Sequence, residues 1–411
     1  MRIHHLNHSD IIGGAARAAY RIHRALIENG LESKMLVDIK ASDDWSVQQK
    51  VRRLFTKFEE MIRQKTAQKI RSQLYTNNPI IHSPAILSSG RVKELNKLNT
   101  DILHLHWVGN EMLSVSDIGK LQKPLVWTLH DMWAFCGAEH YSDDFRWRDG
   151  YTKNNRSIYE SGFDLNRYTW QRKKKYWKRP IHIVAPSRWL ANYAKSSTLM
   201  KSWPVSVIPN PINLEKWKPF EKLKARELLN LPPKTLIIIF GAIGGSNDPR
   251  KGFDLLVGAL QSLQGKLPDL QLLIFGQSKP QNPPNLGFRT HYLGHLHDDL
   301  SLRIAYSAAD LMVIPSRMDN LPNTGVEALA CGTPIVAFDS CGLPDIVQHK
   351  ETGYLAQAFD AEDLANGINW ILSEKGRYSA LCDQARKYAE RRFNPSIVAK
   401  QYKAVYTEAL S

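Results

Sequence analysis

The chain has 411 residues, 43% of them hydrophobic, and a formal net charge of +15. This length exceeds one typical core and predicts two domains of about 200 residues each. It contains no run of about 18 apolar residues, and residues 1–10 lack the apolar core of a signal peptide, so we expect neither a membrane span nor a secreted protein. The four cysteines show no metal-site or disulfide-framework spacing, which indicates a cytoplasmic protein without a metal cofactor.

Short apolar, β-branched runs alternate with helix-length segments along the chain. The runs are 1–6, 34–37, 102–106, 125–129 and 182–185, and then 236–240, 270–275, 291–293, 311–314 and 335–338. This alternation is typical of an α/β fold whose parallel sheets are covered by helices. Pro209 and Pro211 separate the two series, so we expect domains at 1–205 and 206–395.

The first half offers two strand-end sites. Gly13 and Gly14 follow the first strand and precede an Ala-rich helix with Arg17 on its first turn, which lets the backbone approach an anion. His130 and Asp131 follow the run 125–129, where a parallel strand delivers side chains to a ligand site. Arg17 is equally explained as a surface arginine.

Other histidines of the first half have weaker claims to the site. His140 is a further candidate for a ligand pocket. His104 and His106 alternate along one predicted strand face, and we expect them to be packed side chains.

In the second half, a glycine-rich loop at 241–252 follows a strand and ends with Arg250 and Lys251. Such a loop suits a phosphate, although it matches neither a dinucleotide fingerprint nor a phosphate-loop motif. Gly276 and His295 lie in the loops after the next two strands, at the same expected sheet edge.

The segment 315–344 carries the most specific pattern. Asp319 and Glu327 are separated by seven residues, and Asn323 or Thr324 is expected to cap a helix of small residues between them and Pro334. The pattern predicts a strand, a loop, a helix start and another strand. The backbone N–H groups of such a helix start attract phosphate.

This segment resembles the donor-nucleotide signature of family-4 retaining glycosyltransferases. The resemblance implies the GT-B fold, with two Rossmann-like domains facing a cleft, the first binding the acceptor and the second the nucleotide sugar, and a last helix at 396–411 that packs back on the first domain. It implies that Glu327 holds the ribose, that Asp319 lies near the transferred sugar, and that the amides around Asn323 and Thr324 meet the pyrophosphate. The family most often has Glu at the first acid, and Asp319 is one methylene shorter.

The resemblance extends to the other loops. It places Lys251 and the Gly13–Gly14 pair against the donor phosphates, the Gly276 and His295 loops near the donor, and His130 near the reacting groups. Asp131 then orients His130 or lines the acceptor pocket with Arg17 and His140. The family's loop arginine is absent, since Ala242 stands near its position, and Arg250 or Asn247 is the expected replacement.

The resemblance implies transfer of a sugar, with retained anomeric configuration and no metal, from a UDP- or GDP-linked donor to an acceptor hydroxyl. The expected acceptor is a glycan or lipid-linked intermediate of polysaccharide biosynthesis. Two alternatives stay open: a basic nucleic-acid-binding protein, and a sugar-nucleotide epimerase or phosphorylase of the same fold. No known nucleic-acid-binding module appears, so we expect no nucleic acid partner.

The positive charge is concentrated in the first half. Residues 1–210 hold 33 Lys and Arg against 19 Asp and Glu, whereas 211–411 hold 22 against 21. Two basic segments, 50–75 and 146–179, combine cations with apolar and aromatic residues. This combination predicts a protein on an anionic membrane surface, peripheral on the inner face of the cell membrane. The alternative is an amphipathic helix packed on its own domain.

Overall fold

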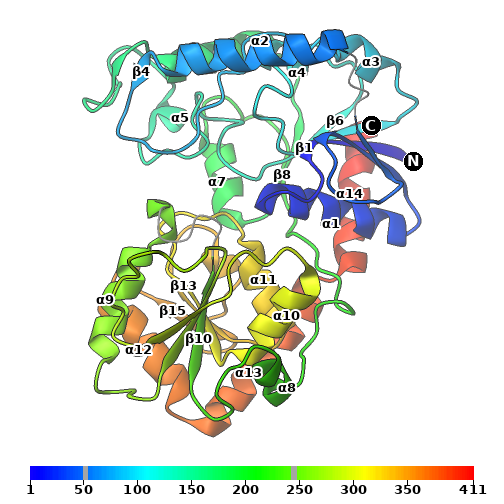
Figure 1. The fold of residues 1–411 in the computed structure, drawn as a ribbon. Coiled ribbons are helices and arrows are strands. Elements are labelled where there is room, and N and C mark those ends of the chain that lie inside the picture. The colour runs from blue at the N-terminus through cyan, green and yellow to red at the C-terminus, as the bar shows by residue number, and fades with distance from the viewer. Residues whose placement is uncertain (50–53, 242–247) are drawn as a thin grey trace. The chain divides into compact units, whose positions relative to one another are not determined.

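The computed structural model describes residues 1–49, 54–241 and 248–411 (Figure 1). They form two compact units, one of Met1–Ile208 with Val398–Ser411 and one of Pro209–Ile397. The chain passes between the units at Ile208, three residues after the expected boundary at 205. Each unit is built on a parallel sheet with helices, so the predicted α/β class is confirmed. Ala242 and Asn247 lie outside the described residues.

The first unit contains a seven-stranded sheet in the order β3-β2-β1-β5-β6-β8-β9, with every neighbouring pair parallel. Its strands are β1 (Arg2–Ser9), β2 (Glu32–Ile39), β3 (Val47–Gln49), β5 (Ile102–Leu105), β6 (Leu125–Thr128), β8 (His182–Ala185) and β9 (Val205–Val207). The chain runs outward from β1 to β3 and then resumes on the other side at β5. The order therefore reverses between β1 and β5, and open α/β sheets bind ligands at such a switch point.

The helices of this unit are α1 (Gly14–Glu28), α2 (Leu54–Arg71), α3 (Val92–Lys97), α4 (Val115–Gly119), α5 (Arg146–Asp149), α6 (Leu165–Tyr176) and α7 (Arg188–Ser196). A small antiparallel pair, β4 (Leu74–Tyr75) and β7 (Ser161–Gly162), joins the end of α2 to the segment before α6. The last helix, α14 (Pro395–Leu410), buries Val398, Tyr402, Val405 and Tyr406 in the same core cluster as Ile3, Ile22 and Ile102 (Figure 1).

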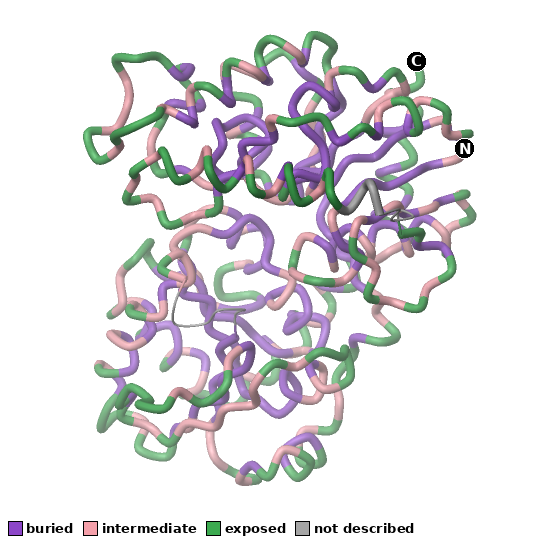
Figure 2. Tube along the Cα trace, turned by 45° about the horizontal axis from the view of Figure 1, so that its top comes forward, coloured by how far each residue is buried: buried purple, intermediate pink, exposed green. Residues whose placement is uncertain are grey.

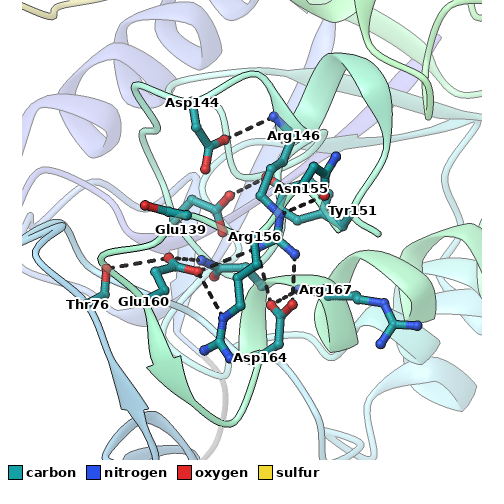
Figure 3. Close-up of polar contacts among 12 residues, drawn as sticks. Thr76, Glu139, Asp144, Arg146, Tyr151, Asn155, Arg156, Glu160, Asp164 and Arg167 are labelled. Atoms are coloured by element: carbon teal, nitrogen blue, oxygen red, sulfur yellow. Dashed lines mark hydrogen bonds and ion pairs between the residues drawn. The ribbon is translucent and has the colours of Figure 1, made fainter. Parts of the chain in front are cut away.

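A buried arginine organises the segment between β6 and α6. Arg146 is 2% exposed, and its Nη2 lies 2.8 Å from Asp164 Oδ2 (Figure 3). Its other contacts are Glu160 at 3.5 Å and Asn155 Oδ1 at 3.3 Å. Glu160 also accepts a hydrogen bond from Thr76, next to β4. These contacts bind the start of α6 to the loops on either side of it, and the loop that carries His140 belongs to the same segment.

The second unit contains a six-stranded parallel sheet in the order β12-β11-β10-β13-β14-β15. Its strands are β10 (Ile237–Gly241), β11 (Gln271–Phe275), β12 (Arg289–Tyr292), β13 (Leu311–Ile314), β14 (Ile335–Phe338) and β15 (Gly353–Ala356). Its helices are α8 (Lys222–Leu228), α9 (Phe253–Leu263), α10 (Asp299–Ala308), α11 (Asn323–Ala330), α12 (Ala361–Leu372) and α13 (Lys375–Arg392), with 3₁₀ turns η2 (Pro249–Lys251) and η3 (Leu343–Asp345). Here the strand order reverses between β10 and β13.

Candidate functional site

The switch point of the second unit brings Lys251 and Asp319 together. Lys251 ends η2, in the connection that follows β10, and Asp319 lies in the loop after β13. Lys251 Nζ donates a hydrogen bond to Asp319 Oδ2 at 2.6 Å, and the carboxylate also accepts from the Asn320 N–H at 3.1 Å. Asp319 is 8% exposed. Two predicted site residues that are 68 positions apart thus form one ion pair at the carboxyl edge of the sheet.

Gly252 explains why these two loops can approach so closely. Its φ of +63° is left-handed, and a Cβ at this position would lie 1.9 Å from the carbonyl oxygen of Pro315. Only glycine fits such a contact without a shift of the backbone. The Arg317 N–H adds a hydrogen bond of 2.7 Å to the Arg250 carbonyl. The lysine loop and the aspartate loop are therefore joined through their backbones as well as through the ion pair.

Arg250 lies beside this pair, but its guanidinium forms an ion pair with Asp248. Its Nη2 lies 2.7 Å from Asp248 Oδ2, and its backbone N–H donates a hydrogen bond to Oδ1 of the same carboxylate. The Asp248 carboxylate therefore balances part of the positive charge that the sequence places in this loop. Asn247, the other expected replacement for the family's arginine, lies outside the described residues.

Glu327 is the fifth residue of α11. It is 2% exposed, and its Oε2 accepts a hydrogen bond of 2.9 Å from the hydroxyl of Tyr306 on α10. Tyr306 itself is fully buried. The buried Tyr306 hydroxyl thus orients the carboxylate that the resemblance assigns to ribose binding, and no sequence pattern indicates this partner.

The predicted cap of this helix is wrong. Asn323 and Thr324 are the first two residues of α11, and the cap position belongs to Pro322, which makes no side-chain cap hydrogen bond. Proline has a fixed φ, here −61°, that leads directly into a helix, so the helix starts one residue earlier than a side-chain cap would allow. A helix start without a side-chain cap leaves its first N–H groups for an anion.

Gly276 and His295 lie at the same sheet edge but are not brought to Lys251 by any hydrogen bond found in the described residues. The Gly276 N–H donates to the Gly294 carbonyl at 2.8 Å, so the loops after β11 and β12 are joined to each other. His295 is exposed, and its ring stacks on that of His297 with the two ring centroids 6.4 Å apart.

In the first unit, His130 lies two residues after the end of β6 and contacts a histidine that follows the neighbouring strand. Its Nε2 lies 3.1 Å from Nδ1 of His106, which follows β5. Burial lowers the pKa of His130 to about 4, so the imidazole is neutral at pH 7. The sequence predicts His106 only as a packed side chain. Its contact with His130 is not indicated by any sequence pattern.

Asp131 pairs with His140 and not with the side chain of His130. Asp131 Oδ2 lies 2.6 Å from His140 Nδ1 and 2.9 Å from the indole nitrogen of Trp107. Burial alone would raise the pKa of Asp131, but the charge and hydrogen bond of His140 outweigh it and lower that pKa overall. His140 Nε2 is held in turn by the Ser83 hydroxyl at 2.8 Å. No hydrogen bond joins Asp131 to the His130 side chain in the described part of the chain, so both predicted roles of Asp131 stay predictions, and Asp131 and His140 line one small cavity with His130.

Gly13 and Arg17 stand where the sequence predicts them, at the start of α1. Gly13 is the cap residue with φ +92°, a conformation that favours glycine, and it makes no side-chain cap. The Arg17 N–H closes the first turn on the Gly13 carbonyl at 3.0 Å, and its side chain is partly exposed. Gly14 is the first helical residue.

One group of residues has the composition of a metal site. Nitrogen atoms of His5, His104 and His106, all buried, lie within 4.8 Å of one another. His5 Nδ1 already lies 2.8 Å from His106 Nε2, and the two nitrogens of His104 contact Tyr406 and Thr128 hydroxyls at 2.8 Å each. Hydrogen bonds account for every nitrogen of the three rings except His5 Nε2, and we assign no metal to them.

Comparisons with known proteins agree with this arrangement. The family model of glycosyltransferase family 4 matches residues 12–216, and that of the group 1 glycosyl transferases matches residues 222–392. A D-inositol 3-phosphate glycosyltransferase of Rhodococcus erythropolis is 30% identical over 200 residues, which are 45% of this chain and 44% of the relative. The corresponding protein of Rhodococcus jostii is 29% identical over 200 residues, 45% of this chain and 43% of that one. The matches therefore span less than half the length of these curated relatives.

Solved structures share the fold over the whole chain. A sucrose-phosphate synthase from Thermosynechococcus elongatus superposes with a TM-score of 0.67 at 20% identity, covering 99% of each chain. The Anabaena protein HepE, solved with UDP and glucose, gives 0.67 at 17% identity over 99% of this chain and 100% of its own. WaaG, a glycosyltransferase involved in lipopolysaccharide biosynthesis, gives 0.65 at 15% identity over 98% and 99%. With two parallel-sheet units and family models matched along both, the chain belongs to the family-4, group 1 glycosyltransferases of the GT-B fold.

Proposed function

We propose that this protein transfers a sugar from a nucleoside diphosphate sugar to an acceptor hydroxyl, with retention of the anomeric configuration. The observation that carries the proposal is the Lys251–Asp319 pair at the switch point of the second unit, next to a helix whose fifth residue is the buried Glu327. A cation, a carboxylate for sugar hydroxyls and a second carboxylate for ribose are the groups that such a donor needs. UDP- and GDP-linked sugars both fit, and UDP is favoured for the first test because HepE was solved with it.

The electrostatic task in this reaction is the charge that develops on the departing diphosphate. In this proposal Lys251 and the N–H groups at the start of α11 stabilise that charge by fixed geometry, which costs no reorganisation in the transition state. Asp319 accepts hydrogen bonds from the transferred sugar, and Glu327 holds the ribose. The acceptor hydroxyl passes its proton to the leaving phosphate on the same face of the sugar, so no enzyme nucleophile is needed.

We assign the acceptor side to the first unit. His130 is neutral and donates or accepts a hydrogen bond at the reacting sugar, while the Asp131–His140 pair forms one wall of the acceptor pocket. Arg17 and the Gly13–Gly14 turn complete the side that binds anionic groups. The acceptor we propose is a glycan or lipid-linked intermediate of polysaccharide biosynthesis.

The test is a thermal-shift panel of UDP-, GDP- and ADP-sugars, followed by nucleotide-release assays with and without added glycan acceptors. Stabilisation by one nucleotide sugar and acceptor-dependent release of the nucleoside diphosphate support transfer. Sugar inversion without an acceptor indicates an epimerase, and release dependent on phosphate indicates a phosphorylase. If no nucleotide sugar stabilises the protein at millimolar concentration, the proposed donor site is wrong.

We also propose that α2 holds the protein on an anionic membrane surface. Figure 2 shows α2 largely exposed, and its free side includes Phe58 at 57%, Met61 at 43% and Ile62 at 42% exposure. Lys65 and Lys69 continue the exposed side. Apolar residues followed by cations suit the boundary between acyl chains and anionic headgroups. No helix in the described part of the chain is long and apolar enough to cross a bilayer.

Sedimentation with liposomes tests this surface. Wild type should bind vesicles that contain anionic lipid and release them in high salt, and Phe58→Ser with Met61→Ser should bind less. Leu223→Ser with Leu228→Ser, at two exposed leucines on α8 of the second unit, is the control that should bind as wild type. Equal sedimentation of both double variants would contradict the assignment to α2.

A further inference from the structure

Three histidines of the first unit form a continuous hydrogen-bonded row that ends at His130. His5 lies on β1, His106 directly after β5 and His130 two residues after the end of β6. His5 Nδ1 is 2.8 Å from His106 Nε2, and His106 Nδ1 is 3.1 Å from His130 Nε2. Successive rings are nearly parallel, with interplanar angles of 25° and 28°. We call these three residues the histidine row.

The row has only two arrangements of protons while its members are neutral. Burial lowers the pKa of His5 and His106 well below 6.5, and that of His130 to about 4, so each ring carries one N–H at pH 7. A neutral imidazole donates from one nitrogen and accepts at the other. Each of the two hydrogen bonds needs one proton, so fixing the direction of one bond fixes the tautomer of all three rings.

The two ends of the row differ in a way that selects the direction. At the inner end, His5 is fully buried and its Nε2 has no hydrogen-bond partner among the described residues. At the outer end, His130 is partly exposed, and no partner for its Nδ1 is found in the described part of the chain. One arrangement puts the unmatched N–H in the core, and the other puts it at the partly exposed end. Orphaned N–H groups are rare in protein interiors, so the second arrangement is favoured.

We propose that His5 and His106 are positioning residues that hold His130 as the Nδ1–H tautomer, which makes His130 a hydrogen-bond donor to the substrate. In this arrangement His5 Nδ1–H donates to His106 Nε2, and His106 Nδ1–H donates to His130 Nε2. The only proton left for His130 is then on Nδ1, at the end of the row away from the core. A donor at this position suits an oxygen of the transferred sugar or of the phosphate. The catalytic part of the inference rests on the proposed glycosyl transfer, whereas the tautomer does not.

Nitrogen NMR of protein labelled with ¹⁵N-histidine tests the tautomer directly. Two-bond ¹⁵N–¹H correlations distinguish Nδ1–H from Nε2–H rings, and the His130 signals are assigned by their absence from His130→Gln. The expected result is an Nδ1–H ring at His130 in the wild type and a mixture of tautomers in His106→Leu. An Nε2–H ring at His130 in the wild type, or an unchanged ring in His106→Leu, overturns the proposal.

Matched variants separate positioning from simple loss of packing. His106→Gln keeps one donor and one acceptor in the row and should restore part of what His106→Leu loses. His23→Gln is the control, because His23 is equally buried but bonds to the Ser33 and Ser46 hydroxyls at 2.7 and 2.8 Å and not to the row. Circular dichroism establishes that each variant is folded before it is compared.

The kinetic outcome distinguishes this inference from the proposed function. His106→Leu should lower kcat on the order of 10-fold or more with little change in donor KM, since a catalytic imidazole in the wrong tautomer loses its role. His23→Gln should leave kcat near the wild-type value. An Nδ1–H signal at His130 in a protein that transfers no sugar would refute the proposed function and leave the row intact. Unchanged kcat in His106→Leu would refute the catalytic role of the row.

Discussion

Replacing Glu327 by glutamine isolates the contribution of its negative charge to donor binding. Glutamine has nearly the same shape and keeps an oxygen that accepts from the Tyr306 hydroxyl, which lies 2.9 Å from Glu327 Oε2. The negative charge of the Glu327 carboxylate, however, is lost in this variant. Hydrogen bonds to a charged group contribute about 1.5–3 kcal/mol against about 1 for neutral pairs. Each of two ribose hydroxyls bound by the carboxylate should therefore lose about 0.5–2 kcal/mol, or about 1–4 kcal/mol in total.

This loss corresponds to a rise in donor KM of roughly 5- to 700-fold, because each 1.4 kcal/mol is a factor of about 10. The ribose is bound equally in the ground and transition states, so kcat should change little. Glu327→Ala removes the acceptor of the buried Tyr306 hydroxyl as well, and loss of this hydrogen bond costs about 1–3 kcal/mol of folding stability. Alanine should therefore lower Tm by several degrees, and glutamine much less.

The assay is steady-state transfer at saturating acceptor with donor varied, together with thermal unfolding of each variant. Tyr306→Phe is the matched control, since it removes the same hydrogen bond and leaves the carboxylate in place. Donor KM in this control should rise less than in Glu327→Gln. A donor KM within about twofold of wild type in Glu327→Gln would refute the ribose assignment, and a large fall in kcat alone would move Glu327 to the reacting groups.

Three further outcomes follow from the described contacts. Asp319→Asn should tighten binding of UDP alone in calorimetry, because Lys251 loses its competing partner, and should lower kcat; weaker UDP binding would contradict the competition. Arg146→Met should lower the free energy of unfolding by about 3–5 kcal/mol in urea titrations, since it takes the arginine from the Glu160 and Asp164 carboxylates, whose side chains are only 7% and 17% exposed, whereas exposed Arg148→Met should cost under about 1. The pKa of buried His23 is about 4 in the folded chain, so between pH 6.5 and 4 the unfolded chain binds more protons and stability falls as pH falls. His23 alone should lower the free energy of unfolding by up to about 2 kcal/mol at pH 5. A smaller loss of stability with falling pH in His23→Gln would show this contribution.

The fold was predictable because it depends on short-range patterning. Runs such as 236–240 and 311–314 are apolar throughout, as buried parallel strands must be, and they became β10 and β13. The turns were also predictable from the sequence, since Gly13 and Gly252 have positive φ angles in loops that only glycine fits. The predicted cap of α11 is wrong for a local reason. Asn and Thr are good caps, but Pro322 immediately before them already fixes the entry geometry.

The site was predictable as a set of residues but not as a set of contacts. Lys251 and Asp319 were each assigned from their own loops, and nothing in either loop encodes their ion pair, because it depends on the crossover that places β10 beside β13. The same holds for His106, whose spacing from His104 signals only a shared strand face. Its contact with His130 requires β5 and β6 to be neighbours in register, with Leu105 opposite Trp127.

In the proposed donor site, these contacts couple phosphate recognition to sugar recognition. Lys251 is held by Asp319, and Arg250 is held by Asp248, so a diphosphate must compete with a carboxylate for each cation. When Lys251 turns toward phosphate, Asp319 loses its partner inside a nearly buried loop, and an unpaired buried charge is costly. Hydroxyls of a transferred sugar can replace the lysine at that carboxylate, whereas a nucleoside diphosphate alone cannot. The ion pair therefore favours an intact sugar donor over the nucleotide product, which is the discrimination that a transferase needs to release its product.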